Sequence, residues 1–178
     1  MNFAGTVVAA ASALTLVLST GAVGAKEQAA EAPSKEQLQR LYIEHLTAEG
    51  YRPDVDVDGD IQFKREGRRY FIIISEKDPE FFRLVLANIW EIEDDLERSR
   101  VLVAADHSNA VSKVSKVYIV KNNVWVCVEL FVAAPEDFRG IFERSMSAMD
   151  AGVSNYVERM REFPAAPQNP SSDDYRGV

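Results

Sequence analysis

Three consecutive runs in which apolar and polar residues alternate constrain the fold of this chain most strongly. A period of two is typical of strands in which every second side chain is buried. The expected strands are residues 51–57, 61–66 and 69–75, separated by the pairs Asp58-Gly59 and Glu66-Gly67. An Asp-Gly pair between alternating runs is a strong hairpin signal. Because strands joined by such short turns must be antiparallel, the sequence predicts an antiparallel meander here.

A helix is expected before these strands. Ser34 and Gln37 have the spacing of a capping box, in which each side chain binds the backbone N–H of the other residue. The apolar face that follows consists of Leu38, Leu41, Tyr42 and Leu46. Gly50 then favours the end of the helix, because glycine readily adopts the left-handed conformation found there.

Further strands and helices are expected after the meander. Residues 81–92 are rich in aromatic and β-branched side chains, which favours a fourth strand; a helix that starts at Pro79 is the alternative. Residues 94–111 predict a helix with acidic side chains at its start. Two strands, 114–120 and 124–132, are joined by an Asn122-Asn123 turn. Pro135 opens a last helix, whose apolar stripe is formed by Phe138, Phe142, Met149, Val153, Tyr156 and Met160.

This order predicts an α+β fold: a helix, a four-stranded antiparallel meander, a helix, two strands and a long C-terminal helix, with the helices packed on one sheet. No linker divides this body, so we expect residues 34–163 to form one domain. Residues 26–33 are expected to be a flexible lead-in. Residues 164–178 lack an apolar period and are expected to be a disordered tail.

Residues 1–25 have an apolar middle and no charged side chain. Val23 and Ala25 fit the −3 and −1 positions of a cleavage site, a pattern typical of a secretory signal peptide. An uncleaved membrane anchor is the alternative, although alanine, serine, threonine and glycine dilute the hydrophobicity of this segment. We expect the mature chain to be periplasmic or secreted, without a stable membrane span.

The net charge and the numbers of cysteines and histidines exclude or disfavour several kinds of binding site. The formal net charge of -8 disfavours binding to nucleic acid. One cysteine, Cys127, excludes an internal disulfide and a cysteine-based zinc site, and only two histidines are present. We therefore expect no cofactor and no metal.

The segment from Asp54 to Asp60 matches the first half of a calcium-binding EF-hand loop, with carboxylates at alternate positions. The match fails at the twelfth position, where Arg65 stands in place of the bidentate glutamate. The favoured interpretation is a hairpin whose aspartates point outward while Val55 and Val57 point inward. Binding of Ca²⁺ or another small ligand at this segment is the alternative function.

The sequence contains no clear catalytic set. Asp106, His107 and Ser108 are the residue types of a hydrolase triad, but adjacent residues on a helix point about 100° apart. His45 borders an apolar stripe and Cys127 lies among large apolar neighbours, which is typical of packing residues. We expect a protein that is not an enzyme; a thiol- or histidine-dependent hydrolase is the third hypothesis.

Two charge clusters either contact a partner or have a simpler explanation, which is the commoner case. The simpler explanation is a solvated hairpin tip for the basic cluster and a helix N-terminus that favours acidic side chains for the acidic one. The basic cluster around the Glu66-Gly67 turn is Lys64, Arg65, Arg68 and Arg69. The acidic cluster at the expected start of the second helix is Glu91, Glu93, Asp94, Asp95 and Glu97. If both clusters face partners, their opposite signs favour head-to-tail association.

Several short strings resemble the YbjN-like family, named for a bacterial sensory-transduction regulator. They are Glu49-Gly50-Tyr51, residues 58–63 (DGDIQF), Glu66-Gly67 with Tyr70, residues 104–109 (AADHSN) and residues 113–119 (KVSKVYI). The resemblance spans residues 41–160 and implies a fold similar to type III secretion chaperones. It also implies a domain that acts by binding proteins, with no catalytic residues to carry over. Asn109 and Lys116 match the polar signature of the family, with a structural role at a helix end or a sheet edge as one interpretation.

The leading hypothesis is an exported, non-catalytic module with a protein-binding, chaperone-like or regulatory role. Its expected partner is a protein or peptide, and self-association as a homodimer is part of the same hypothesis. The candidate contact or signature positions are Asn109, Lys116, Lys64, Arg65, Arg68 and Arg69.

Overall fold

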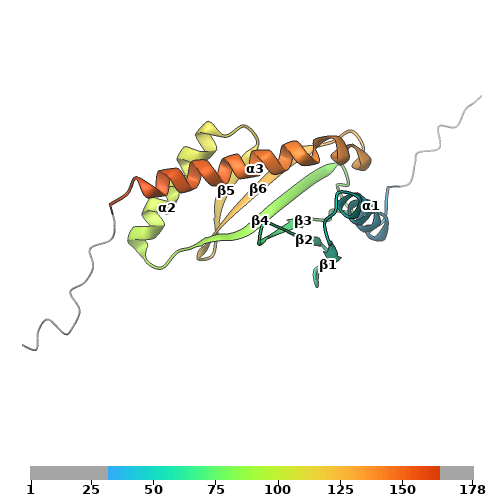
Figure 1. Ribbon diagram of the computed structural model, residues 1–178, viewed down its shortest axis with the longest axis horizontal. Coiled ribbons are helices and arrows are strands. Elements are labelled where there is room, and N and C mark those ends of the chain that lie inside the picture. The colour runs from blue at the N-terminus through green and yellow to red at the C-terminus, as the bar shows by residue number, and fades with distance from the viewer. Residues whose placement is uncertain (1–31, 165–178) are drawn as a thin grey trace, which may run out of the picture. The chain divides into compact units, whose positions relative to one another are not determined.

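The computed structural model describes residues 32–164 (Figure 1). The expected signal peptide, residues 26–31 of the lead-in and the tail beyond Pro164 lie outside the described residues. The elements are α1 (Lys35–Ala48), β1 (Asp54–Val55), β2 (Ile61–Arg65), β3 (Arg68–Ile72), β4 (Phe81–Glu91), α2 (Asp95–Val111), β5 (Ser115–Val120), β6 (Asn123–Phe131), a 3-10 turn η1 (Pro135–Asp137) and α3 (Phe138–Arg161). Their order confirms the predicted α+β fold.

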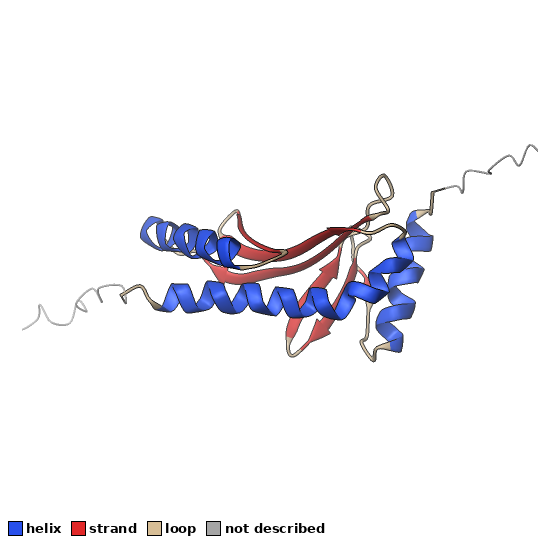
Figure 2. Ribbon diagram, turned by 90° about the horizontal axis from the view of Figure 1, so that it is seen from above, coloured by secondary structure: helices blue, strands red, loops and turns tan. Residues whose placement is uncertain are grey.

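The strands of the described part form one antiparallel sheet in the order β1-β2-β3-β4-β6-β5. The first four are neighbours in chain order, as the predicted meander requires. Helix α3 runs along the sheet in Figure 2, and all three helices contribute buried side chains to one core on the same face. Within residues 32–164, no helix is both long and apolar enough to cross a membrane.

Helix α1 begins and ends where the sequence predicts. The Ser34 hydroxyl accepts a hydrogen bond from the Gln37 N–H at 3.4 Å, and the Ser34 N–H donates to the Gln37 side chain at 2.7 Å. This reciprocal capping satisfies two backbone donors that the helix itself leaves unpaired. The chain leaves the helix at Gly50, whose φ of 87° lies in the left-handed region that favours glycine.

The first predicted strand, residues 51–57, is wrong over most of its length, because only Asp54 and Val55 pair with β2. Two local causes shorten it. Pro53 has no N–H to donate to a sheet, and the Tyr51 ring packs inward against Phe63, with centroids 5.0 Å apart. The predicted inward orientation of the valines is also wrong, since Val55 is 43% exposed and Val57 is 101% exposed.

The β2–β3 hairpin turns at Glu66 and Gly67, whose φ values of 53° and 78° fit a two-residue primed turn. Residues Phe81–Glu91 form a strand, so the alternative of a helix starting at Pro79 is wrong.

The turn between β5 and β6 lies one residue earlier than predicted. Lys121 has a φ of 57°, and Asn123 already pairs with Val120.

The predicted apolar stripe of α3 is confirmed, because all six of its members are buried. Pro135 opens the short η1 turn that leads into the helix, not the helix itself.

Helix α2 packs closely on α3: the Ser108 hydroxyl donates to the Gly152 carbonyl at 2.9 Å. A Cβ atom on Gly152 would lie 2.5 Å from Ser115 Oγ, so the contact with β5 requires glycine there.

Candidate functional site

The face of the sheet opposite the helices carries an apolar surface, which we call the outer patch. It consists of Phe71, Phe81, Val85, Ala87, Trp125, Cys127 and Phe131, which alternate along β3, β4 and β6 with residues of the core, and of Ile73, which follows β3. None of them belongs to the core cluster beneath the helices. Val85 and Cys127 are each only 1% exposed. An antiparallel sheet with one solvated face normally places polar residues on it. The apolar outer patch therefore departs from the pattern of a sheet that faces only water.

A hollow of about 490 Å³ lies over part of the outer patch. Its lining includes Phe71, Val85 and Trp125, with the aspartates of the β1–β2 turn at one side. The Trp125 ring is fixed in place, because its indole N–H donates to the Asn88 side chain at 3.0 Å. Asn88 itself has a φ of 55° and lies in the irregular part of β4, where the register with β6 shifts.

The outer patch ends in an aromatic pair. Phe81 and Phe131 are neighbours across β4 and β6, with ring centroids 5.4 Å apart. Phe131 is 79% exposed, which is unusual for a side chain of this size on a strand. The pair extends the apolar surface beyond the hollow.

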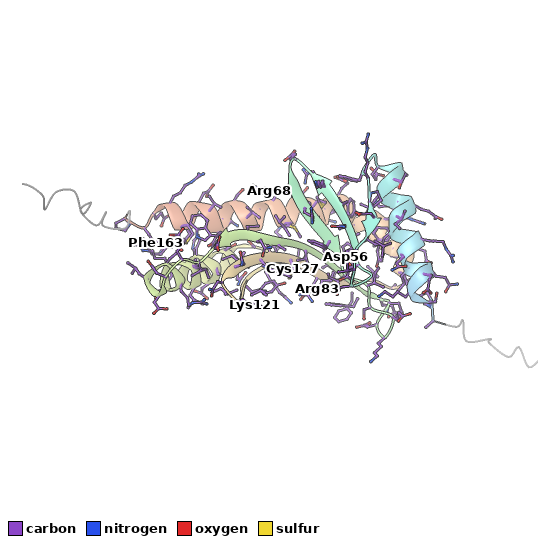
Figure 3. All side chains as sticks on the ribbon, turned by 90° about the horizontal axis from the view of Figure 1, so that it is seen from below. Asp56, Arg68, Arg83, Lys121, Cys127 and Phe163 are labelled. Carbon is purple, nitrogen blue, oxygen red and sulfur yellow. The ribbon has the colours of Figure 1, made fainter. Side chains whose placement is uncertain are left out.

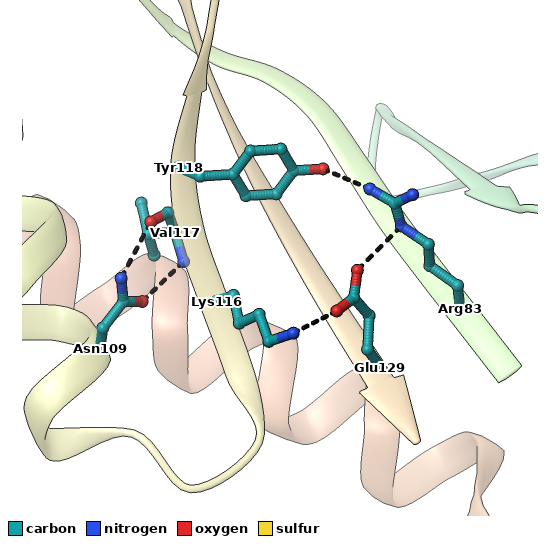
Figure 4. A network of polar contacts seen from close by, with 6 residues as sticks. All are labelled: Arg83, Asn109, Lys116, Val117, Tyr118 and Glu129. Atoms are coloured by element: carbon teal, nitrogen blue, oxygen red, sulfur yellow. Dashed lines mark hydrogen bonds and ion pairs between the residues drawn. The ribbon is translucent and has the colours of Figure 1, made fainter. Parts of the chain in front are cut away.

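A network of charged side chains crosses the same face between the apolar residues (Figure 4). The Glu129 carboxylate forms an ion pair with Arg83, with Nε 3.1 Å from a carboxylate oxygen, and accepts a hydrogen bond from the Lys116 ammonium. Arg83 also donates to the Tyr118 hydroxyl at 3.0 Å. Burial alone would raise the pKa of Glu129, but the hydrogen bond and charge of Lys116 and the charge of Arg83 hold it below the ordinary value. Two cations therefore share one carboxylate, and the network keeps a net positive charge.

Cys127 lies beside this network and is 1% exposed (Figure 3). Burial, followed by the charge of Glu129, raises the pKa of its thiol to about 11. A thiol needs a lowered pKa and access to solvent to act as a nucleophile. Cys127 therefore has the properties of a buried packing residue.

The two histidines are not placed beside Cys127. The His45 ring lies edge-on to Phe138 and Phe142 on the helix side of the sheet, with centroids 4.9 and 5.2 Å apart. Burial lowers its pKa, which favours the neutral imidazole. His107 is exposed on α2, whereas its neighbour Ser108 is fully buried and bound to Gly152. The adjacent Asp106, His107 and Ser108 thus do not form a hydrogen-bonded triad.

The aspartates of residues 54–60 organise the chain locally. The Asp56 carboxylate accepts the backbone N–H groups of Asp58 and Asp60, each at 2.9 Å. The Asp60 carboxylate accepts the Ile74 N–H at 2.8 Å, and burial raises its pKa. In the part of the chain that the structure covers, no group of three or more His, Cys, Asp or Glu side chains is arranged to hold a metal ion. The observed contacts are those of a tightly bonded turn.

Asn109 and Lys116, the two signature positions, contact different parts of the sheet. The Asn109 side chain donates to the Val117 carbonyl at 3.0 Å and accepts the Val117 N–H at 2.7 Å. It therefore occupies the outer edge of β5, while the cap of α2 is Ser112. Lys116 pairs with Glu129 on the outer face.

The four residues of the basic cluster have different surroundings. Arg65 binds Asp150 of α3 at 2.9 Å and so ties the hairpin to the helix. Lys64, Arg68 and Arg69 are exposed, and Figure 3 shows Arg68 at the tip of the hairpin. Lys64 and Arg69 are direct cross-strand neighbours. A second hollow, of about 570 Å³, lies beside these two residues.

The acidic cluster holds the junction between β4 and α2. Asp94 caps the helix by accepting the Glu97 N–H at 2.7 Å. The Glu97 carboxylate accepts the indole N–H of Trp90 at 2.9 Å and the Glu93 N–H at 2.6 Å. Asp94 and Glu97 therefore have a structural role at this junction.

The outer patch was not among the features predicted from the sequence. The pattern that indicates it is present in two nearly continuous apolar runs, FFRLVLA (residues 81–87) and VWVCV (residues 124–128). A strand with one polar face would alternate there, so these runs indicate strands that are apolar on both faces. The network around Glu129 carries no comparable signal, because it depends on the register of three strands.

No protein-family model and no curated protein matches the chain. Among solved structures, it is similar to the crystal structure of YbjN, a proposed transcription regulator from E. coli. The TM-score is 0.49 and the sequence identity is 16%, over 76% of this chain and 99% of YbjN. The similarity concerns the arrangement of helices and strands alone.

Proposed function

We propose that this chain is an exported, non-catalytic module that binds another protein through the outer patch. The observation that carries the proposal is the cluster of apolar and aromatic side chains on the face of the sheet without helices. Apolar and aromatic side chains on the open face of a folded domain are typical of protein-binding sites, in which aromatic residues are enriched. A chaperone-like role and a regulatory role would both act through such a surface.

The non-catalytic part of the proposal is supported by the candidate reactive groups. Cys127 has a raised thiol pKa and is buried, and His45 packs between aromatic rings on the other side of the sheet. Neither arrangement supplies the activated nucleophile and adjacent base that covalent catalysis requires.

Export is supported by the sequence of residues 1–25, with its apolar middle and its small residues at the expected cleavage site. A protein partner outside the cytoplasm is therefore part of the proposal. Self-association stays a prediction, and the molar mass of the purified chain in solution tests it.

The direct test of binding compares three forms of the chain as affinity baits in the native host, each expressed with its own leader. The wild type and Leu102→Ser should retain the same partner, because Leu102 is 56% exposed on α2, away from the sheet. Phe81→Ser combined with Phe131→Ser should lose it. The proposal fails if all three forms retain the same proteins, or if the wild type retains none above an untagged control.

A further inference from the structure

We infer that the open edge of β2 binds an extended, acidic segment of a partner protein. The inference rests on the proposed function, since both require a protein ligand. It concerns a different surface, however, and names the chemistry of the ligand: a strand-forming segment rich in aspartate or glutamate.

The two edges of the sheet differ in how far they are covered. At the β5 edge, the Asn109 side chain occupies both backbone groups of Val117. At the other edge, β1 pairs only with Ile61 and Gln62 of β2. In the described residues no strand pairs with the outer side of β2 from Phe63 to Arg65. An uncovered edge is where an extended segment can add as a further strand.

The hairpin geometry determines which backbone groups point to this edge. In a two-residue hairpin the residues next to the turn, here Arg65 and Arg68, form a hydrogen-bonded pair. Hydrogen-bonded and non-bonded pairs alternate along an antiparallel ladder. The next pair, Lys64 with Arg69, is therefore non-bonded, and the N–H and C=O of Lys64 point away from β3. The N–H can donate a hydrogen bond to an added strand, and the C=O can accept one from it.

The charges at this edge favour an anionic ligand. Lys64 and Arg69 face each other across the two strands, and like charges in this position destabilise a sheet. Both line the hollow of about 570 Å³, together with Arg52. Asp54 is the acidic residue of the lining, and its carboxylate accepts from the Gln62 amide at 3.0 Å. The carboxylates of a ligand would neutralise the cationic pair, whereas Arg65 is already paired with Asp150.

The hollow also has the apolar contact that an extended segment needs. Tyr51 lines it and packs on Phe63, so one wall is aromatic. A strand beside β2 would place alternate side chains on either face of the sheet. Carboxylates on one face would reach Lys64 and Arg69, and apolar side chains on the other would reach Tyr51.

The experiment measures binding of a fluorescent peptide of alternating valine and glutamate to the purified chain, by fluorescence anisotropy. We expect saturable binding that weakens with salt, and weaker binding of the same peptide with lysine in place of glutamate. A copy of the acidic peptide N-methylated at alternate residues keeps its charge but cannot form the backbone pairs. It should bind at least about tenfold more weakly than the parent.

The variants separate this edge from the overall charge of the protein. Lys64→Gln with Arg69→Gln should weaken binding at least about tenfold, as expected for two lost charge-assisted contacts. Arg139→Gln with Arg144→Gln removes two exposed cations from α3 and should leave the affinity within about twofold. Equal effects of the two double variants, or equal binding of the N-methylated peptide, would overturn the inference.

Two further outcomes are decisive. If the acidic peptide does not bind but the Phe81→Ser/Phe131→Ser bait still loses its partner, the edge inference fails and the proposed function stands. If the wild type is a dimer or larger in solution and Lys64→Gln/Arg69→Gln is a monomer, the occupant of the edge is a second copy. That result also overturns the inference.

Discussion

The side chain of Asn109 binds the backbone of Val117 as a neighbouring strand would. Its amide donates to the Val117 carbonyl at 3.0 Å, and its oxygen accepts the Val117 N–H at 2.7 Å. A carboxamide offers the same donor and acceptor as a peptide group, so one side chain from α2 occupies the exposed edge of β5 at this point. The contact both joins the helix to the sheet and obstructs pairing with another chain.

Replacing Asn109 should therefore destabilise the fold and open the edge. We expect Asn109→Ala to lower the free energy of unfolding by about 1–2 kcal/mol, because two backbone groups lose their partner. Urea denaturation measures this change. His107→Ala, at an exposed position on the same helix, should change it by no more than about 0.5 kcal/mol. Equal effects of the two substitutions would contradict a specific role for Asn109.

The close contact between α3 and β5 predicts opposite effects at two glycines of one helix. Gly152→Ala places a Cβ 2.5 Å from Ser115 Oγ, and we expect it to destabilise the protein by about 1–3 kcal/mol. A Cβ on Gly140 meets no atom within 4 Å. Gly140→Ala should stabilise the protein by up to about 1 kcal/mol, because alanine has the higher helix propensity. Thermal unfolding of both variants checks the prediction, and a stabilising Gly152→Ala would contradict it.

The network around Glu129 predicts a pH dependence of stability. Its pKa is lower in the folded chain than the ordinary 4.5, so its contribution is fully present above that pH. The contribution is lost as the pH falls below this value and the carboxylate becomes protonated. Glu129→Gln should therefore be less stable than the wild type at pH 7, and the difference should shrink towards pH 3. Urea denaturation at both pH values measures it, and a difference that does not change with pH would contradict the prediction.

Cys127 should be unreactive while the chain is folded. Its thiol is buried and has a pKa of about 11, so little thiolate forms at pH 8. Iodoacetamide at pH 8 should leave it unmodified for hours in buffer and alkylate it quickly in urea, as followed by mass spectrometry. Ser147→Cys combined with Cys127→Ser provides a matched exposed thiol on α3, which should react in buffer. Rapid alkylation of native Cys127 would instead favour the thiol-dependent hydrolase hypothesis.

The features that the sequence predicts correctly are local. The capping box of Ser34 and Gln37 and the buried stripe that includes Phe138 and Tyr156 are encoded within one helix each, so spacing alone identifies them. The hairpin at Glu66 is likewise specified by its turn residues and the alternation beside it.

The features that could not be predicted from the sequence depend on contacts between distant segments. The pair of Arg83 and Glu129 requires the register of β4 against β6, and Arg65 meets Asp150 only when α3 crosses the hairpin. The first strand was predicted too long because an alternating pattern does not show that Tyr51 turns inward to meet Phe63. Local spacing fixes the elements, whereas the surfaces that could bind a partner arise from how the elements pack.

Photocross-linking in living cells tests most directly whether the outer patch binds a partner protein. A benzoyl-phenylalanine placed at Phe131, which is 79% exposed, should form a cross-link to a partner protein that mass spectrometry can identify. The same group at Leu102, which is 56% exposed on α2, should not cross-link to that protein. Cross-links to the same protein from both positions, or none from Phe131, would contradict the claim that this face of the sheet binds a partner.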